Sequence, residues 1–185
     1  MKENRKISTK AIVFSAVSIS LSTVLANYVK LPSLPFGGSA TLFSMLFVAL
    51  PGFFFGPVVG ITAAVSHGIL QLISNPYVIH PVQVVLDYLL AFGALGLSGF
   101  FSRKKNGLLT GYIVGVLGRF VFSSVSGLIF FTEYTKVLSE NAAAVWASVL
   151  YNISYLFPEM ILTIIVLLIP PVRNGVKYIK KIAVE

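Results

Sequence analysis

One carboxylate lies inside an otherwise apolar segment of the chain. Asp87 falls within residues 82–101, a run that is long enough and apolar enough to span a bilayer. An ionisable side chain near the centre of a membrane helix costs roughly 2.5–3.5 kcal/mol on insertion scales. A membrane segment keeps such a residue where it has a partner or a function. Asp87 is therefore the first candidate for a binding site.

Polar and small side chains follow helical spacing in three of the apolar runs. The stripes are Gln83, Asp87 and Ser98; then Arg119, Ser123 and Gly127; and then Ser148, Asn152, Glu159 and Thr163. Residues three or four apart share one face of a helix, and the polar parts of the stripes lie toward the same end of the predicted bundle. They predict a water-accessible pocket that opens outward and is lined by Asp87, Arg119 and Asn152.

The chemistry of this predicted pocket suits an organic cation with flat rings. A carboxylate balances positive charge, and aromatic faces attract a desolvated cation with about 2 kcal/mol or more. Aromatic side chains fall at the same level of the bundle, among them Tyr77, Tyr88 and Phe131. The sequence has no Walker A motif, no His-Glu-x-x-His, no Gly-x-Ser-x-Gly and no cysteine. We therefore expect a protein that is not an enzyme, with no metal and no cofactor.

The composition places the chain in a membrane. Of its 185 residues, 56% are hydrophobic and only 11% are charged, with a mean hydropathy of +0.89, whereas soluble domains carry about 25% charged residues. The net charge is +8. Eleven of the fourteen basic residues fall in three clusters, within residues 2–10, 103–105 and 173–181. This is the pattern of cytoplasmic loops in a multi-pass protein.

The apolar runs predict one all-α domain, residues 1–185, built as a bundle of six membrane-spanning helices. The runs are residues 11–28, 40–55, 57–74, 82–101, 108–131 and 145–170. An even number of spans brings all three basic clusters, and both termini, to the cytoplasmic side. The boundary between the second and third runs is soft, because only a Pro-Gly-Phe-Phe-Phe-Gly-Pro segment separates them.

Several of these residues have a purely structural alternative. The glycine stripes, which include Gly52, Gly56 and Gly60, are expected to be packing surfaces. Asp87 and Arg119 are either an ion pair or direct ligand contacts. His67 is expected to be a core histidine rather than a proton relay, and Glu159 is either a relay or an acid that joins helices. Trp146 is expected in an interfacial aromatic belt.

At these positions the sequence resembles the thiamine-specific substrate-binding (S) components of energy-coupling factor (ECF) transporters. The similarity rests on His80–Gln83 with Leu86–Tyr88, on Arg119–Phe120, on Ser126–Phe131, and on Tyr151–Asn152 with Tyr155 and Pro158. It extends over nearly the whole chain and is strongest over residues 75–160. Ser123 stands where other members carry histidine, and Phe131 where some carry tryptophan.

The resemblance implies a six-helix S-component fold in the bacterial plasma membrane, with a vitamin pocket near the outer face. The implied substrate-binding residues are Tyr77, Asp87, Tyr88, Arg119, Ser123, Gly127, Phe131 and Asn152. The implied function is high-affinity capture of thiamine, followed by inward delivery when a transmembrane coupling subunit and two ATPases act on the chain. Ala11-xxx-Ser15 or Ile12-xxx-Ala16 would contact that coupling subunit.

Two alternative functions stay open at this point. One is an S component for another vitamin, such as the pyrimidine precursor of thiamine or riboflavin. The other is an ion-coupled secondary transporter that uses Asp87, His67 or Glu159 as its proton site. A third possibility, an intramembrane enzyme acting on lipids, is disfavoured because the sequence has no metal or nucleophile motif.

Overall fold

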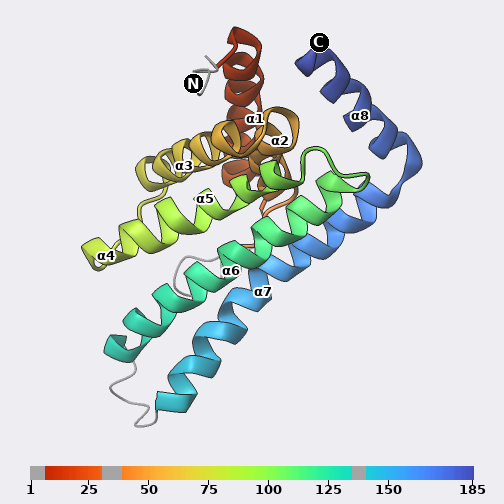
Figure 1. Ribbon diagram of the computed structural model, residues 1–185. Coiled ribbons are helices and arrows are strands. Elements are labelled where there is room, and N and C mark those ends of the chain that lie inside the picture. Colours follow the sequence, from red (N-terminus) through yellow and green to blue (C-terminus); the bar gives the residue numbers. More distant parts are fainter. Residues whose placement is uncertain (1–6, 31–38, 135–140) are drawn as a thin grey trace, which may run out of the picture.

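The computed structural model describes residues 7–30, 39–134 and 141–185, of which 130–134 and 141–144 are described as helical backbone only. Within these ranges every regular element is a helix, apart from one isolated antiparallel bridge between Lys30 and Thr41. Figure 1 shows the elements in order: α1 (Thr9–Tyr28), α2 (Ser44–Phe55), α3 (Pro57–Ser74), α4 (Pro81–Gln83), the π-helix η2 (Val84–Leu90), α5 (Ala91–Leu95), the 3₁₀-helix η3 (Gly96–Phe101), α6 (Gly107–Tyr134), α7 (Asn141–Leu168) and α8 (Pro170–Val184).

The predicted all-α membrane class is confirmed. Among the described residues, five helical segments are long and apolar enough to cross a bilayer: Thr9–Tyr28, Pro57–Ser74, Pro81–Phe101, Gly107–Ile129 and Val145–Leu168. The remaining predicted span, 40–55, is the 12-residue helix α2. Its length of about 18 Å is well below the roughly 30 Å of a bilayer core. The count of six spans and the cytoplasmic position of both termini therefore stay predictions.

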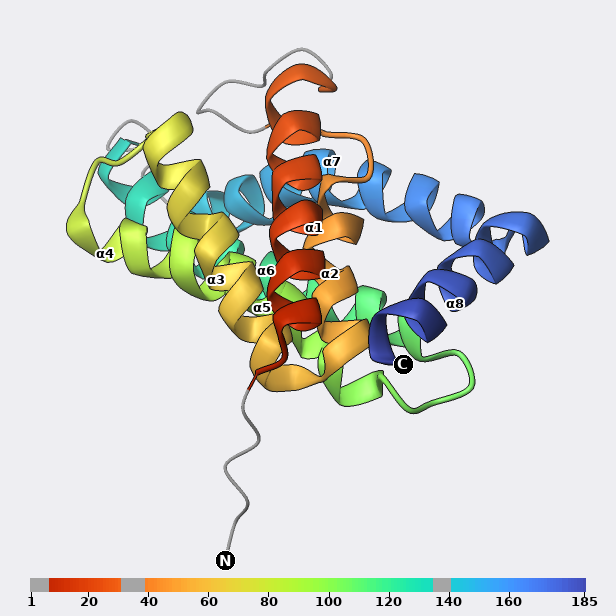
Figure 2. The same ribbon diagram turned by 90° about the horizontal axis from the view of Figure 1, so that it is seen from above.

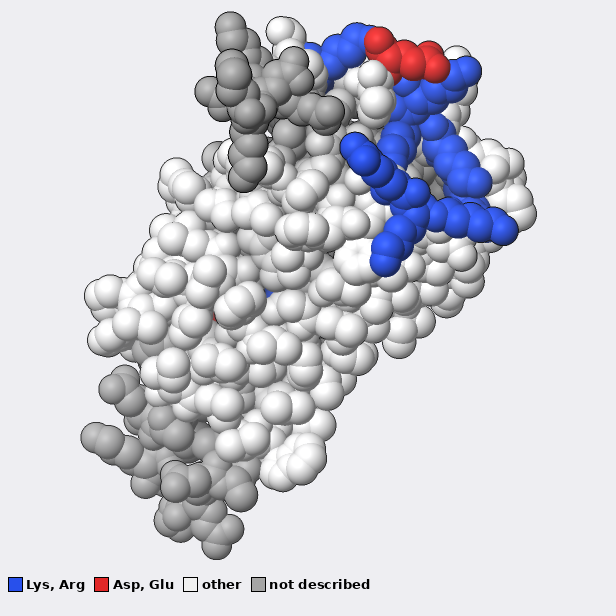
Figure 3. Space-filling view, viewed as in Figure 1, with Lys and Arg blue, Asp and Glu red and all other residues white. Residues whose placement is uncertain are grey.

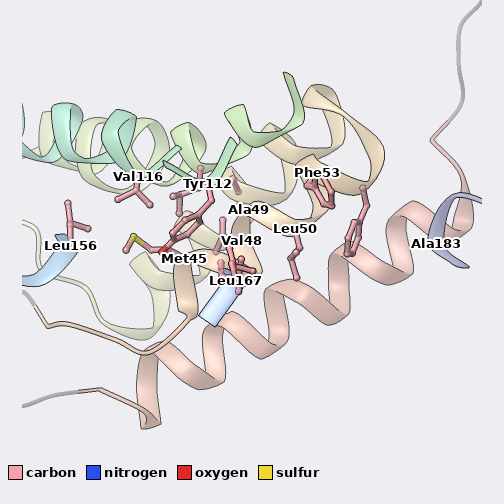
Figure 4. Packing of buried hydrophobic residues seen from close by; sticks show 14 residues of the cluster. Met45, Val48, Ala49, Leu50, Phe53, Tyr112, Val116, Leu156, Leu167 and Ala183 are labelled. Atoms are coloured by element: carbon pink, nitrogen blue, oxygen red, sulfur yellow. The ribbon is translucent and has the colours of Figure 1, made fainter. Parts of the chain in front are cut away.

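Helix α2 lies at the centre of the bundle, where it packs against α1, α3 and η3. Ten of its residues are buried. Figure 4 shows Met45 and Val48 of α2 beside Tyr112 and Val116 of α6 and near Leu156 of α7. A short helix that is apolar on every side is stable here because its neighbours cover its whole circumference.

The junction of α2 and α3 is built on glycine. Gly56 adopts φ +96°, a left-handed conformation that favours glycine, and Pro57 then begins α3. This turn defines the boundary between the second and third apolar runs, which the sequence located only approximately. At Gly60 of α3, an added Cβ would lie 2.4 Å from Cα of Gly52. The packing interpretation of the glycine stripe is thus confirmed for Gly52 and Gly60, whereas Gly56 serves the turn.

The segment 81–101 is helical throughout but changes its winding three times. After α4, the π-helix η2 gives way to α5, and η3 follows as a 3₁₀-helix. The N–H of Ala91 donates to the carbonyl oxygen of Leu86, five residues earlier. A π-turn is wider than an α-turn and is frequent at functional sites. Asp87 and Tyr88 both belong to it, so their side chains point differently from those of a regular helix.

The chain beyond Leu168 departs from the prediction. The last span was expected to reach residue 170, and the basic residues after it were interpreted only as a topology signal. Instead, Ile169 is extended and Pro170 begins a separate helix, α8, which runs back toward the start of α1 (Figures 1 and 2). Val172, Val176 and Ala183 anchor α8 to the core.

Candidate functional site

A cavity of about 570 Å³ opens between α1, α2, α3, η2, α6 and α7. Seven of the eight predicted substrate-binding residues line it: Tyr77, Asp87, Tyr88, Arg119, Ser123, Gly127 and Asn152. The eighth, Phe131, belongs to α6, but its side chain lies outside the described residues. The structure therefore brings the predicted side chains together, while their role in binding stays a prediction.

The cavity lies at one end of the bundle. It is lined by Ala26 and Lys30 near the end of α1, by Ser74 at the end of α3, and by the later half of α6. The basic loop 102–106, which precedes α6, lies at the opposite end with α8. If the basic end faces the cytoplasm, as the charge pattern predicts, the cavity faces outward.

Asp87 is held in the cavity wall by a helix distant in sequence. Its Oδ2 accepts a 2.8 Å hydrogen bond from Oγ of Ser126, on α6. A hydroxyl donor stabilises a carboxylate and fixes its direction, and a hydrogen bond to a charged group contributes about 1.5–3 kcal/mol. Asp87 is thus a positioned acceptor in a membrane-embedded cavity.

Tyr88 lines the cavity, and its hydroxyl is hydrogen-bonded to the connection between α3 and α4. The hydroxyl accepts a 2.9 Å hydrogen bond from the N–H of Tyr77 and donates one of 3.2 Å to the carbonyl oxygen of Asn75. These two bonds tie the connection between α3 and α4 to η2. Tyr88 can therefore offer an aromatic surface to a ligand while it holds Tyr77 at the cavity edge.

Asn152 is buried and oriented within α7 at the cavity wall. Its Nδ2 donates to the carbonyl oxygen of Ser148 at 2.9 Å, and its Oδ1 accepts from the hydroxyl of Tyr155 at 2.6 Å. An asparagine amide offers two donor hydrogens and two acceptor lone pairs, so these bonds use half of its capacity. The ring of Tyr155 also meets that of Tyr151 edge to face, 5.6 Å between centroids.

Arg119 stacks on an aromatic ring instead of pairing with a carboxylate. Its Cζ lies 4.2 Å from the centroid of the Phe92 ring, a cation–π contact. Within the described ranges, the only ion pair joins Lys181 to Glu185, so the predicted alternative of an Asp87–Arg119 ion pair is not observed there. The Nε of Arg119 is buried and has no acceptor among those residues.

Glu159 joins α7 to the beginning of α2. Its carboxylate accepts hydrogen bonds from Oγ1 of Thr41 at 2.5 Å, Oγ of Ser44 at 3.1 Å and the N–H of Met45 at 2.8 Å. A helix N-terminus carries partial positive charge and unpaired N–H groups, so it favours an anion. Of the two roles left open for this acid, the contacts support that of joining helices.

His67 has the contacts of a core histidine. Its Nε2 lies 3.4 Å from Oγ of Ser22, and its Nδ1 lies 3.3 Å from Oγ1 of Thr23, both on α1. The ring also packs edge to face on Phe92, 5.1 Å between centroids. His67 is 1% exposed, lines the cavity and links α1 to α3 there.

Several residues that shape the cavity were missed by the sequence analysis. Ser126, which holds Asp87, lies three positions after Ser123 on the same face of α6, and this spacing is the signal that could have found it. Phe92, whose ring contacts Arg119, follows Asp87 by five residues. In a regular α-helix, residues five apart do not share a face, so the spacing gives no sign that both lie at the cavity. Thr41 lies 118 residues from its partner Glu159, and no local pattern predicts such a contact.

Similarity to known proteins extends over most of the chain. Residues 12–179 match the family described as Thiamine transporter protein (Thia_YuaJ). The chain belongs to the thiamine transporter family. It is 31% identical over 170 residues to thiamine transporter ThiT of Bacillus subtilis strain 168, and the match covers 84% of each chain.

A solved structure of ThiT from Listeria monocytogenes resembles this member of the thiamine transporter family in fold. The TM-score is 0.57, with 18% sequence identity, and the match covers 94% of this chain and 91% of that chain. At this identity the likeness supports the fold alone.

Proposed function

We propose that this chain is the thiamine-binding subunit of an ECF-type importer. One observation carries the proposal: a positioned carboxylate, Asp87, lies in a cavity of about 570 Å³ inside a membrane bundle. An amide, hydroxyls and aromatic rings surround it, in a chain that belongs to the thiamine transporter family. Thiamine combines a cationic thiazolium ring with an aminopyrimidine, and these groups complement that lining.

Each predicted residue has a distinct task in this proposal. Asp87 balances the charge of the vitamin or accepts from its amino group, and Asn152 adds hydrogen bonds. Gly127 leaves room for a flat ring next to α6. Phe131, one helical turn further along, is proposed to stack on that ring. Such interactions between stacked rings contribute about 0.5–1.5 kcal/mol beyond the area that they bury.

Inward delivery requires partners in this proposal, because the sequence contains no ATP-binding motif. A transmembrane coupling subunit and two ATPases would supply the energy. The two candidate contact patterns on α1 differ in their exposure to solvent. Ala11 and Ser15 are buried against the bundle, whereas Ile12 is 59% exposed and Ala16 is exposed. Ile12-xxx-Ala16 is therefore the pattern that remains accessible to a coupling subunit.

Calorimetric titration of the purified full chain with thiamine, in detergent and without ATP, tests the binding function. We expect stoichiometric binding. Calorimetry is preferable to quenching of Trp146, because that side chain is 64% exposed, as expected for an interfacial aromatic, and it is not among the residues described as lining the cavity. Heat with riboflavin or with the pyrimidine precursor, and none with thiamine, would keep the class and change the substrate.

Uptake into vesicles tests the proposed energy source. We expect vesicles that contain this chain alone to bind thiamine without accumulating it. Accumulation that follows a proton gradient in the absence of any ATPase would favour the ion-coupled alternative. Silence across a panel of vitamins in both assays would overturn the proposal.

A further inference from the structure

A second, smaller cavity lies at the basic end of the molecule, away from the proposed thiamine site. Its volume is about 100 Å³, and it opens between the loop 102–106 and α8. Three cations line it: Lys105 from the loop, and Arg173 and Lys177 from α8. Apolar residues that include Phe53, Leu108 and Leu167 form the remaining wall. The cavity thus combines convergent positive charge with an apolar surface.

Positive charge at this end is nearly unopposed. The loop and α8 contain seven cations, Arg103, Lys104, Lys105, Arg173, Lys177, Lys180 and Lys181, and one acid, Glu185, directly follows α8. Figure 3 shows this concentration of Lys and Arg side chains where Figure 1 places α8, while most of the visible described surface carries no charge. Glu185 lies 3.7 Å from Lys181 and is exposed to solvent, so it does not neutralise the cations that line the cavity.

The cations in and beside the cavity have two roles: some hold the cavity wall in place, and the three that line the cavity keep positive charge available. Lys180 donates to the carbonyl oxygen of Ser102 and lies 3.8 Å from the centroid of the Phe53 ring, so it fixes α8 to the bundle. Nη2 of Arg173 donates to Oδ1 of Asn106 at 2.7 Å. These contacts position the cavity wall. No ion pair forms between its three cations and the acids that the structure describes, so their charge remains available to an anion.

The exposure of α8 indicates that the helix lies at a membrane surface. Val176 and Lys180 face the core, and the cations Arg173 and Lys177 follow on one flank of the helix. On the opposite flank, Ile179 is 44% exposed and Ile182 is 46% exposed. A short helix with a cationic flank and an uncovered apolar flank is typical of the boundary between headgroups and acyl chains.

We propose that the cavity between the loop 102–106 and α8 binds the headgroup of an anionic phospholipid. The phosphate would lie among Lys105, Arg173 and Lys177, and an acyl chain would follow the apolar wall near Leu108 and Leu167. Basic pockets between membrane helices on the cytoplasmic side are a known mode of lipid recognition. The apolar wall favours a lipid over a free phosphate ion, which would leave that wall uncovered.

Native mass spectrometry of the full chain in detergent, with phosphatidylglycerol or phosphatidylcholine added, tests the site. We expect retention of phosphatidylglycerol in preference to phosphatidylcholine. The double variant Lys105→Gln with Lys177→Gln spares the hydrogen bond between Arg173 and Asn106. A hydrogen bond to a charged group contributes about tenfold in affinity, so this variant, which removes two contacts to the phosphate, should lose roughly 100-fold.

The matched control removes the same number of charges outside the cavity. Arg103→Gln with Lys104→Gln alters two exposed cations of the same loop, and we expect its retention of phosphatidylglycerol to stay within about twofold of the unmodified chain. An equal loss in both variants would overturn the site and leave a general electrostatic attraction. Should the double variant fail to fold, Lys177→Gln alone should lose about tenfold.

Inorganic phosphate separates a lipid site from a site for small anions. We expect millimolar phosphate to leave phosphatidylglycerol bound, because phosphate has no acyl chain to cover the apolar wall. Complete displacement of the lipid by phosphate would overturn the proposal, and so would an absence of preference between the two lipids.

Discussion

Ser126 of α6 donates a 2.8 Å hydrogen bond to Oδ2 of Asp87 in the π-helix η2. The two residues are 39 positions apart, and the bond fixes the carboxylate in the wall of the larger cavity. A positioned acceptor loses little conformational entropy when a ligand arrives, and preorganisation of this kind raises affinity. The relationship thus connects the unusual winding of η2 to the proposed capture of a cation.

Substitution Asp87→Asn should weaken thiamine binding far more than binding of the uncharged pyrimidine precursor. The variant removes the negative charge and keeps the shape of the side chain. A hydrogen bond to a charged group contributes about 1.5–3 kcal/mol, which corresponds to roughly 10- to 100-fold in affinity for thiamine. Parallel calorimetric titrations with the two ligands measure the difference.

The variant Ser126→Ala serves as the control for this prediction. It keeps the charge of Asp87 and removes only the hydroxyl that orients it, so the loss for thiamine should be under about tenfold. Equal losses for the charged and the uncharged ligand in Asp87→Asn would contradict the charge-pairing role.

Substitution Glu159→Gln should destabilise the bundle. The carboxylate accepts from Thr41, Ser44 and the N–H of Met45 at the start of α2, and an amide offers a single acceptor oxygen and no charge. We expect a loss of about 1–3 kcal/mol, measured as a lower Tm by circular dichroism in detergent. The exposed Glu185→Gln is the control and should leave the Tm unchanged. An unaltered Tm in Glu159→Gln would indicate that the charge of this acid contributes nothing to stability.

Local periodicity was sufficient to predict much of the cavity. Asp87, Arg119 and Asn152 stand in stripes that repeat every three or four residues, and a stripe of this kind turns one helix face toward its neighbours. The apolar runs located the long helices, because a membrane helix needs an uninterrupted stretch of apolar residues. Both features are properties of single helices, which a sequence displays directly.

Other features depend on contacts that no local pattern contains. The change to π winding at Val84–Leu90 follows no simple sequence signal. The sequence therefore did not predict that the side chain of Asp87 points differently from that of a residue in a regular α-helix. Glu159 meets Thr41 only after the bundle has formed. The basic residues after Pro170 fit the charge pattern of a cytoplasmic terminus, which explained them without a helix. Their amphipathic spacing, which also predicts the separate helix α8, was therefore not used.

Substitution Gly60→Ala should lower the stability of the chain, whereas Gly175→Ala should not. An added Cβ at Gly60 lies 2.4 Å from Cα of Gly52, a contact with backbone that cannot yield, whereas a Cβ at Gly175 of α8 meets no atom within 4 Å. Overpacking typically costs 1–3 kcal/mol, and alanine in an open helical position gains up to about 1 kcal/mol over glycine. Thermal unfolding of both variants in detergent measures the contrast. A similar decrease in Tm for both would show that close packing at Gly60 is not the cause.

Substitution Gly127→Phe should block thiamine while the bundle stays folded. Gly127 lines the cavity, so a phenyl ring there occupies space that the ligand needs. Steric strain of 1–3 kcal/mol lowers affinity by about fivefold to 150-fold. Val125→Phe is the matched control, because Val125 lies on the same helix but is 40% exposed and does not line the cavity. We expect that variant to bind thiamine like the unmodified chain, and both variants to keep a cooperative melting transition. Unchanged binding in a folded Gly127→Phe would place the ligand away from this face of α6.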